Sequence, residues 1–501
     1  MIAQKYSNIL FLILLILSYF SIFWKLDSHS LYHYDEARNA INALEMHFNG
    51  NYFVRYYLGQ PDTWEIKPPF LTWLQLISFK TIGFNELAVR LPIALSALGT
   101  IILIFFYFKN VLQDTSTGFF SCLTLISTNG YINYHVTRTG DHDAVLIFFL
   151  LSLLFTFYKY IHKDKLTTAL GLGILLFLSV FTKSIAGFFF IPGFIIYSIK
   201  EKKLFDLLKR RSFYLGILLF LILISGYYLT ANHFNPGFIK LVWENEWSPR
   251  FLNVFGGKKY DLSDNKWYYF NILRTTHFKY YIWFLVFPIF IILAQKRLRN
   301  RSFYILTWSI IIPFMIILSN EVKIGWYAAP IYPLLAISIG MGVSQGLILI
   351  TNSTLFNKRI LLTINIIVPI LFFSIPYSRI LNKINNAKGS GEKFGEVLLH
   401  LENIKPTQKD YVVLYEKRNP VYIWYEQLYN RIKSYNIKGH VYKNSLEPFK
   451  NEITIERDVI ICNETILNEV KKTYNSQCNL YFDKCYVCKF AIKDSMKEER
   501  Q

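Results

Sequence analysis

Long apolar runs separated by short polar segments occupy the first three quarters of the chain. A helix that crosses the hydrocarbon core of a bilayer needs about 20 mostly apolar residues. The pattern therefore predicts eleven membrane-spanning helices, some of them short, and it excludes a single soluble globule and a disordered chain. The predicted spans lie near residues 8–24, 88–108, 117–134, 144–161, 166–181, 186–199, 212–230, 279–294, 303–319, 327–350 and 359–375.

The last quarter of the chain, residues 377–501, has a different pattern. Short apolar runs such as DYVVLYE, NPVYIWYE, DVIICNE and NLYFDKCYVCKF alternate there with helix-like stretches such as GEKFGEVLLHLENI and LNEVKKTY. This alternation is typical of a small α/β domain. We expect a mainly α, polytopic membrane domain over residues 1–376, followed by a soluble α/β domain over residues 377–501.

The charge of the chain supports this division. Charged residues make up only 18% of the 501 residues, and lysine and arginine outnumber aspartate and glutamate by 54 to 34. In a soluble protein such an excess would suggest a nucleic-acid partner. If the N-terminus is cytoplasmic, however, Lys5 and the predicted inner loops carry 17 basic residues and four acidic ones. This bias follows the positive-inside rule, so the excess reports topology and no nucleic-acid partner is expected.

The same rule assigns the remaining segments to the outer side of the cytoplasmic (inner) membrane. The first apolar run follows Lys5 and lacks a small-residue cleavage site, which predicts a retained anchor. Residues 68–83 are apolar but short and contain Lys80. Counting them as a span would reverse every later loop, so we expect an interfacial helix on the outer face. The predicted outer segments are 25–87, 135–143, 231–278, 320–326 and 377–501.

Two acidic clusters occur in these outer segments. Asp35 and Glu36 open a helix-like stretch, where carboxylates also favour a helix N-terminus. The short second outer loop, YHVTRTGDHDAV, contains a dense polar group that is either a turn satisfying helix ends or a site. Its Asp-x-Asp spacing would suit a divalent cation, although two carboxylates and one imidazole are weak evidence for any metal. The members of that group are Arg138, Asp141, His142 and Asp143.

Several cations accompany the carboxylates on the outer side. Each of them alone would suit a side chain that anchors a helix end at the membrane surface. Together, cations suit a phosphate group, and a nearby carboxylate suits removal of a proton from a hydroxyl. The combination predicts transfer of a group carried on a lipid phosphate. The cations are Lys67, Lys183, Arg250 and Lys323, and the neighbouring candidates for substrate binding are Glu65, Glu246 and Tyr327.

The order of these motifs resembles a known class. The segment DEARNAINALEMHFNGNY is followed by EIKPPFLTWLQLISFKTIGFNELAVRLP, and then by RTGDHDAV, TKSIAG and KIGWYAAPIYPLLAI. Over about residues 1–350 this order resembles GT-C class membrane glycosyltransferases. The resemblance is greatest to the bacterial relatives of dolichyl-phosphate-mannose protein mannosyltransferases and to the lipid A aminoarabinose transferases. The most specific part runs from Asp35 to Pro92.

The resemblance implies a role for individual residues. The catalytic carboxylate of the class matches Asp35, with Glu36 beside it, and a second acidic position matches Asp141 or Asp143. The cations would hold the phosphate of a polyprenyl-phosphate donor. A direct displacement at the anomeric carbon, with Asp35 as general base, would invert that centre. The cations that match basic positions of the class are Lys67, Lys183, Arg250 and Lys323.

Two departures from the class pattern affect the metal expectation. Ile66 separates Glu65 from Lys67, whereas relatives often have Glu directly before Lys-Pro-Pro. Glu246 is followed by Trp247, where relatives often have His. We therefore expect no firmly bound metal or other cofactor, although the carboxylates leave room for a divalent cation. A polyprenyl monophosphate can be stabilised by Lys and Arg alone.

The acceptor stays open between lipid A, a protein and a surface glycan, and so does the sugar. A transporter or flippase of lipid-linked sugars is a rival, but it would place ionisable residues or helix breaks at mid-membrane. A surface-polysaccharide polymerase or ligase is a second rival. Four of the five cysteines lie in the tail, and an even number outside the cell favours one or two disulfides over a zinc site or free thiols. They are Cys462, Cys478, Cys485 and Cys488.

Overall fold

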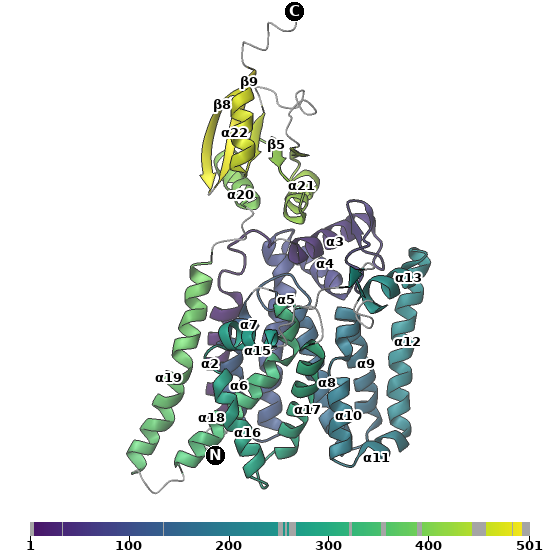
Figure 1. Cartoon of the computed structure of the whole chain (residues 1–501), viewed down its shortest axis with the longest axis vertical. Helices are drawn as coiled ribbons and strands as arrows, with labels where there is room; N and C mark the ends of the chain where they lie inside the picture. The colour runs from purple at the N-terminus through teal and green to yellow at the C-terminus, as the bar shows by residue number, and fades with distance from the viewer. Residues whose placement is uncertain are drawn as a thin grey trace, which may run out of the picture.

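The computed structural model describes most of the chain. The described residues are 5–32, 34–133, 135–248, 254–255, 258–259, 267–319, 323–351, 357–387, 393–442, 457–482 and 484–492. Helices standing side by side form the larger part, and a sheet with its own helices lies beyond one end of them (Figure 1). The mainly α architecture with a small α/β region at the C-terminus is therefore confirmed.

Helices dominate up to residue 387. From the N-terminus they are α2 (Ser7–Ser18), η1 (Tyr19–Phe23), α3 (Asp35–Asn49), α4 (Phe70–Ile82), α5 (Glu86–Asn110), α6 (Thr115–Ile126), α7 (Asn129–Ile132), α8 (Asp143–His162), α9 (Leu166–Lys183), η2 (Ser184–Phe188), α10 (Ile191–Lys200), α11 (Leu204–Lys209) and α12 (Arg211–Phe234). Then follow α13 (Phe238–Val242), η3 (Trp243–Trp247), α15 (Tyr268–Ile272), η4 (Leu273–His277), η5 (Ile282–Leu285), α16 (Val286–Ala294), α17 (Arg301–Ser319), η6 (Gly325–Ile331), α18 (Tyr332–Thr351) and α19 (Lys358–Asn385). Two short hairpins, β1 (Tyr56–Tyr57) with β2 (Gln60–Pro61) and β3 (Val254–Phe255) with β4 (Lys258–Lys259), interrupt them.

Every run that was predicted to span the membrane contains a helix. Among the described residues, seven helices are long and apolar enough to cross a bilayer. An eighth crossing results if the pair Tyr268–His277 and Ile282–Ala294, bent by 118°, is one span. The other three predicted spans are shorter apolar helices, at Ser7–Phe23, Thr115–Ile126 and Ile191–Lys200. A multi-pass membrane protein is confirmed, and the count of eleven spans stays a prediction.

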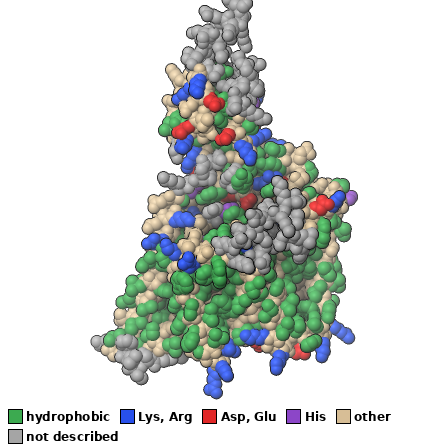
Figure 2. Space-filling view, in the orientation of Figure 1, with side chains coloured by type: hydrophobic (Ala, Val, Ile, Leu, Met, Phe, Trp, Pro, Cys, Tyr) green, Lys and Arg blue, Asp and Glu red, His purple; other side chains and the backbone are tan. Residues whose placement is uncertain are grey.

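The surface agrees with a membrane orientation. Figure 2 shows a broad belt of hydrophobic side chains, with Lys and Arg along the edge farthest from the C-terminal sheet. Helix α4 has 13 residues and lies beside α3 at the opposite end of the bundle, near the C-terminal sheet. It is not among the helices long enough to cross a bilayer. This placement is consistent with an interfacial helix.

The last long helix continues beyond its predicted end. The apolar run ends at residue 375, but α19 extends to Asn385. Pro376 lacks an N–H and so removes one backbone hydrogen bond, yet it does not end the helix. The final turns are polar and include Asn382 and Lys383, so an apolarity criterion cannot find them.

A five-stranded sheet forms the core of the C-terminal region. Its strands are β5 (Asp410–Tyr415), β6 (Asn436–Val441), β7 (Asp458–Ile461), β8 (Tyr474–Phe482) and β9 (Cys485–Ile492), in the order β6-β5-β7-β9-β8. Both neighbours of β5 run parallel to it, whereas β9 is antiparallel to β7 and to β8. The helices of this region are α20 (Phe394–Ile404), α21 (Pro420–Ile432) and α22 (Glu464–Thr473).

Alternate residues of β5 face opposite layers, as the period of a strand requires. Tyr411, Val413 and Tyr415 pack with α20 and α21. Val412 and Leu414 pack with α22 on the other face. The sheet is thus covered on both sides by helices.

One of the short apolar runs of the tail is a helix. NPVYIWYE resembles a strand in composition but forms the start of α21. Asn419 accepts hydrogen bonds from the backbone N–H groups of Val421 and Tyr422, and Pro420 occupies the first turn. A capping Asn followed by Pro starts a helix, and here it outweighs the β-branched and aromatic composition.

The four cysteines of the tail form two disulfides, which confirms that preference over a zinc site. Cys462 pairs with Cys485, and Cys478 pairs with Cys488. The two cysteines of the CYVC motif therefore have different partners. The fifth cysteine, Cys122, is buried and free.

Helix α21 docks the C-terminal sheet onto the membrane region. One hydrophobic cluster contains residues of α3, α4 and α5 together with residues of α20, α21 and β5. The rings of Phe79 and Trp424 are 5.8 Å apart. Tyr425 Oη donates to Glu86 Oε1 at 2.6 Å, and Gln427 Nε2 donates to Glu45 Oε1 at 2.8 Å. The outer surface of α3 is therefore covered by the C-terminal region.

Candidate functional site

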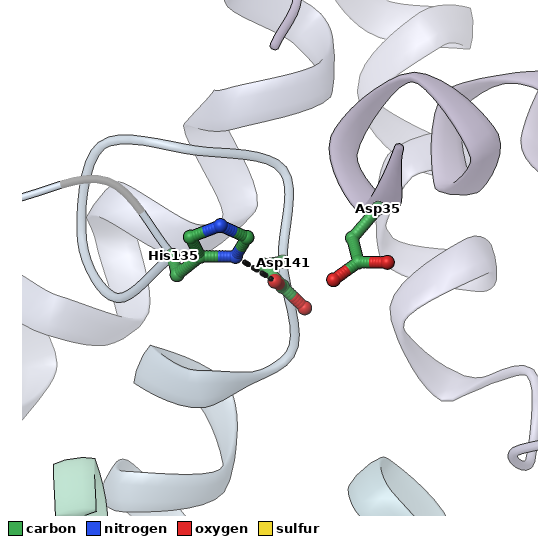
Figure 3. A group of neighbouring side chains, drawn as sticks. All are labelled: Asp35, His135 and Asp141. Carbon is green, nitrogen blue, oxygen red and sulfur yellow. Dashed lines mark hydrogen bonds and ion pairs between the residues drawn. The ribbon is translucent and has the colours of Figure 1, made fainter. Parts of the chain in front are cut away.

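Asp35 is the first residue of α3, immediately after a backbone turn. Tyr34 has the left-handed φ of 66°, which redirects the chain into the helix and is uncommon for a residue other than glycine. The helix ends where Gly50 adopts a left-handed conformation, a frequent C-terminal arrangement. The Asp35 side chain thereby points from the start of α3 towards the second outer loop (Figure 3).

The second outer loop supplies the facing groups. Figure 3 shows His135 and Asp141 on this loop, opposite Asp35 on its helix. Asp35, His135 and Asp141 each offer one polar atom, and these atoms lie within 4.8 Å of one another. His135 Nδ1 is 3.0 Å from Asp141 Oδ2, and its ring stacks on Trp326 at 3.7 Å between centroids. The structure thus brings together two carboxylates that are 106 positions apart in sequence.

Asp141 is held between two histidines. Its Oδ1 accepts a hydrogen bond from the backbone N–H of His142 at 2.7 Å and lies 3.2 Å from the Nδ1 of the same residue. Burial would raise the pKa of Asp141, but its hydrogen bonds to His135 and His142 outweigh this and hold the pKa well below its usual range. Asp141 is therefore an ionised carboxylate that fixes the imidazoles.

The pKa of Asp35 is shifted in the opposite direction. Burial raises its pKa from 3.8 to about 6, and the charges of Asp141 and Glu65 add to the increase. Lys67 and His135 oppose it without cancelling it. A carboxylate with a pKa close to 6 is still largely ionised at neutral pH and is a stronger base than an exposed aspartate.

Glu36, the neighbour of Asp35 in sequence, points into the protein and is buried. Its Oε1 lies 2.7 Å from Arg90 Nε and accepts from the Gly140 N–H at 2.8 Å. Its Oε2 accepts from the Tyr32 N–H at 2.6 Å and from Arg90 Nη2 at 3.0 Å. Glu36 thus ties α3, α5 and the second outer loop together, and both of its oxygens are occupied.

The buried Glu65 and the half-buried Lys67 form an ion pair near Asp35. Lys67 Nζ lies 2.8 Å from Glu65 Oε1, and Arg55 Nη2 lies 3.5 Å from the same oxygen. Burial would raise the pKa of Glu65, but Lys67 and then Arg55 lower it to about 2. The residue between them, Ile66, packs in a hydrophobic cluster with Phe181. The inserted Ile therefore leaves both charged side chains on the same side of the backbone.

A second pair lies at the start of α8. Lys183 Nζ is 2.7 Å from Asp143 Oδ1, and it also lies 5.8 Å from the centre of the Tyr327 ring. Lys323 Nζ lies 5.9 Å from the ring centre of Tyr269. Lys183 and Tyr327 are thereby brought together, as expected for residues of one site.

Unpaired polar atoms surround these pairs. Among the described residues, Asp143 Oδ2, His142 Nε2, Glu246 Oε1 and Arg55 Nη1 are buried without a hydrogen-bond partner. The charge of Glu246 also acts on Lys67. Burial lowers the pKa of His142 to about 4. Buried polar groups normally have partners, so this concentration of unpaired atoms is where polar groups of a ligand would complete the bonding.

Another predicted site residue, Arg138, binds the end of a helix. Arg138 donates to the backbone carbonyls of Ile22 and Trp24, both at 2.9 Å, and so caps the helix formed by α2 and η1. The hydrogen bonds described for its guanidinium all go to backbone carbonyls. Arg250 lies outside the described residues.

Comparison with known proteins agrees with this architecture. Residues 66–228 match the family model described as dolichyl-phosphate-mannose-protein mannosyltransferase. ArnT from Cupriavidus metallidurans, solved with bound undecaprenyl phosphate, superposes with a TM-score of 0.68 at 14% identity, covering 98% of this chain and 99% of that one. The chain has the GT-C fold of membrane glycosyltransferases. The resemblance inferred from the sequence is thereby confirmed.

Two curated relatives of this GT-C protein show how far the sequence similarity extends. An uncharacterized protein of Aquifex aeolicus is 26% identical over 327 residues, which cover 65% of this chain and 62% of that relative. The putative mannosyltransferase YkcB of Bacillus subtilis is 27% identical over 196 residues, 39% of this chain and 26% of YkcB. The chain therefore spans less than two thirds of the length of the curated relatives it matches.

The cluster of Asp35, His135 and Asp141 has the dimensions of a divalent metal site. Aspartate and histidine are ordinary ligands of such metals. However, both oxygens of Asp141 already bond to His135 and His142. A metal ion would have to replace the contact between His135 and Asp141. The donor set fits a cation only at that cost, and the expected absence of a firmly bound metal stays a prediction.

Sequence reasoning missed three residues that organise the site. His135 lies in the second-loop motif, but the sequence does not distinguish it from its neighbours, because its role depends on a left-handed backbone with φ of 70°. Arg90 belongs to the Arg-Leu-Pro motif, which was a usable signal for the partner of Glu36. Arg55 lies in an ordinary loop, and nothing in the sequence indicates its proximity to Glu65.

Proposed function

We propose that this GT-C protein is an inverting glycosyltransferase. It would move a sugar from a polyprenyl-phosphate donor to an acceptor at the outer face of the cytoplasmic membrane. The observation that carries the proposal is the position of Asp35, a carboxylate of raised pKa that lies near Asp141 and the partly buried Lys67. A second partly buried cation, Lys183, is paired with Asp143 of the same loop region, and both cations suit a phosphate. The name of the matched family and the undecaprenyl phosphate in the ArnT structure support this choice of donor.

Asp35 acts as the general base. It accepts the proton of the acceptor hydroxyl while that oxygen attacks the anomeric carbon of the donor sugar. The bond between the anomeric carbon and the phosphate oxygen breaks at the same time, and polyprenyl phosphate leaves with the electron pair. One displacement of this kind inverts the anomeric centre.

Lys67 and Lys183 stabilise the departing phosphate. Each ammonium is held by a carboxylate, Glu65 at 2.8 Å and Asp143 at 2.7 Å, so its position is set before the donor arrives. Preorganised charges lower the barrier because they need not reorient as negative charge develops. Tyr327, beside Lys183, and Lys323 would line the donor's phosphate end.

The other candidates of the site have supporting roles. Glu36 is a positioning residue, because its oxygens are occupied by Arg90, Tyr32 and Gly140. Asp141 orients His135 and His142 and raises the basicity of Asp35 by its charge. Glu246, with an unpaired buried oxygen, is available to a sugar hydroxyl.

We place the site and residues 377–501 on the extracytoplasmic side. The two disulfides of the tail are typical of an oxidising compartment. The Lys- and Arg-rich edge of the hydrophobic belt lies at the opposite end, where the positive-inside rule puts the cytoplasm (Figure 2). The tail would then form an outer domain that covers α3.

Purified protein in lipid nanodiscs provides the test. Polyprenyl-phosphate-mannose is the first donor to try, because the matched family and YkcB are named for mannose. Asp35→Asn should bind the donor as the wild type does but lose sugar transfer by a factor of 100 or more, about the minimum contribution of a general base. Glu244→Gln, an exposed outer change, is the matched control and should transfer normally.

The acceptor is found by a second experiment. Mass spectrometry of lipid A, envelope glycans and glycoproteins from a deletion strain would show which of them loses a sugar. Wild-type transfer by Asp35→Asn, or unchanged products in all three fractions, would contradict the proposal.

A further inference from the structure

A second polar region lies away from the catalytic cluster. It is a cavity of about 580 Å³ between the first outer loop, the α7 region and the end of α19. The Glu65–Lys67 and Asp143–Lys183 pairs do not line it. The basic side chains that line it are Lys25, His29, Arg90, Arg138 and Lys383.

The positive charge of this cavity is poorly compensated. Among the residues that the structure describes, no carboxylate lines this cavity, and Arg90 is the one lining cation with an acidic partner, Glu36. Lys383 donates to Asn129 Oδ1 at 2.9 Å, and Arg138 binds backbone carbonyls. Within the part of the chain that is described, no ion pair involves Lys383 or Arg138. An anion would gain from all of these charges at once.

A smaller cavity of about 220 Å³ extends the basic surface. It shares Asn129, Ile380 and Lys383 with the first cavity and adds Lys279 and Arg379, and its described lining residues again include no carboxylate. The two added cations lie over the Tyr280 ring, at 6.0 Å and 5.6 Å from its centre. The two cavities therefore form one continuous cationic surface beside α19.

The depth of this surface points to a lipid. Trp24 and Tyr280 are 38% and 42% exposed beside it, and half-exposed aromatic residues mark the level of lipid headgroups. Below it, α19 presents exposed apolar side chains, among them Ile370 and Leu371 at 58% and 61% exposure. Figure 2 shows Lys and Arg side chains gathered at this edge, directly above the hydrophobic belt.

We propose that these two cavities bind the phosphate group of a membrane lipid, with its acyl chains lying along α19. The cations supply the charge, and the apolar face of α19 supplies the contact for the chains. Basic pockets beside transmembrane helices recognise anionic headgroups in this way. The site is a second lipid site, separate from the one proposed for the donor, and its test requires no sugar transfer.

Lipid binding to the full-length protein is the measurement. The protein, in a neutral detergent, is titrated with phosphatidylglycerol, with phosphatidic acid and with phosphatidylcholine, and bound lipid is counted by native mass spectrometry. The variant Lys383→Gln with Arg379→Gln should bind both anionic lipids more weakly, by about fivefold for each charge removed. Lys240→Gln, an exposed cation on another outer helix, is the control and should bind as the wild type does.

Further measurements distinguish a lipid phosphate from free inorganic phosphate as the ligand. Inorganic phosphate should compete only at concentrations far above those of the lipids, because it lacks the chains. Lys25→Gln alone, at the rim of the larger cavity, should give about a fivefold loss and serves if the double variant does not fold. Equal binding of phosphatidylglycerol by wild type and Lys25→Gln would overturn the proposal. Equal affinity for inorganic phosphate and for phosphatidic acid would also overturn the assignment to a lipid.

Discussion

Glu36 Oε1 lies 2.7 Å from Nε of Arg90, a residue 54 positions further along the chain. Both side chains are only 2% exposed. The adjacent residue, Asp35, instead lies near Lys67 and His135, whose charges act on it. The two adjacent carboxylates of the first outer loop therefore differ in role. Glu36 is bound within the structure, whereas Asp35 is available for chemistry.

This division predicts different outcomes for the two carboxylates. Glu36→Gln removes the acidic partner and leaves the buried charge of Arg90 unpaired, which should lower the free energy of unfolding by about 3–5 kcal/mol. The change is measured as a reduced melting temperature in detergent. Glu244→Gln, exposed and outside the pair, is the control. If Glu36→Gln melted like the wild type but had lost sugar transfer, Glu36 would be a catalytic residue instead.

The raised pKa of Asp35 predicts the pH dependence of transfer. A general base must be deprotonated to act, so protonation of Asp35 below its pKa of about 6 should abolish activity. We expect kcat/KM to rise about tenfold per pH unit below that value and to become level above it. The profile is recorded with saturating detergent-solubilised acceptor. A rate that stays constant from about pH 5 to 7 would exclude Asp35 as the titrating base.

The same pKa shift predicts that ionised Asp35 lowers the free energy of unfolding of the wild type. Burial raises the pKa of Asp35 from 3.8 to about 6, so the ionised form is more favourable in the unfolded chain. The free energy of unfolding should therefore fall as the pH rises from about 4 to about 6 and remain lower above that range. Asp35→Asn removes this loss and should be more stable than the wild type at pH 7, by about 1–3 kcal/mol.

Melting temperatures of both proteins at two pH values test this prediction. Near pH 4 the aspartate is protonated in the folded protein, and the two proteins should melt within a degree or two of each other. Near pH 7 the variant should melt higher. A variant that is less stable than the wild type at pH 7 would show that ionised Asp35 makes favourable contacts in the folded state.

Much of the fold could be predicted because a bilayer imposes a simple requirement on sequence. Each apolar run contains a helix, and residues 68–83 contain α4, which is not among the described helices long enough to cross a bilayer. Asp35 and Lys67 could be named because they lie in a motif that a known class shares. The position of His135 could not be predicted from the sequence, because a left-handed turn and a stacking contact with Trp326 bring its ring to Asp141.

Local composition does not indicate the structure where a specific interaction outweighs it. The run that begins at Asn419 is rich in β-branched and aromatic residues, yet capping by that Asn starts α21. Glu36 could not be separated from Asp35 by sequence, because which of two adjacent carboxylates meets Arg90 depends on the direction in which α3 starts. Such choices are made by tertiary contacts, which a single sequence does not display.

Chelation tests whether the cluster of Asp35, His135 and Asp141 holds a metal. Both oxygens of Asp141 already have imidazole partners, so we expect transfer to continue after treatment with EDTA and removal of the chelator. The metal content of the purified protein is measured in parallel by mass spectrometry. Activity that is lost with EDTA and restored by one divalent cation would show that a metal replaces the contact between His135 and Asp141.

The contact between α21 and the membrane region predicts that the C-terminal domain supports the active site. Tyr425 Oη donates to Glu86 Oε1 at 2.6 Å and accepts from the Leu31 N–H at 3.3 Å, close to the turn that precedes Asp35. Tyr425→Phe keeps the ring but leaves the buried Glu86 without that hydrogen bond, which should cost about 1–3 kcal/mol. Because Leu31 then loses its hydrogen bond to Tyr425, kcat should fall severalfold while donor binding stays close to that of the wild type.

Proteolysis and kinetics of the same variant distinguish this role from a general loss of stability. A matched change on the far side of the sheet, Tyr486→Phe, alters a tyrosine that does not contact α3. If the two variants lost equal stability but only Tyr425→Phe had a reduced kcat, docking of the domain would be coupled to the position of Asp35. If kcat were unchanged in Tyr425→Phe while the tail became sensitive to protease, the domain would merely be attached to a membrane region that works without it.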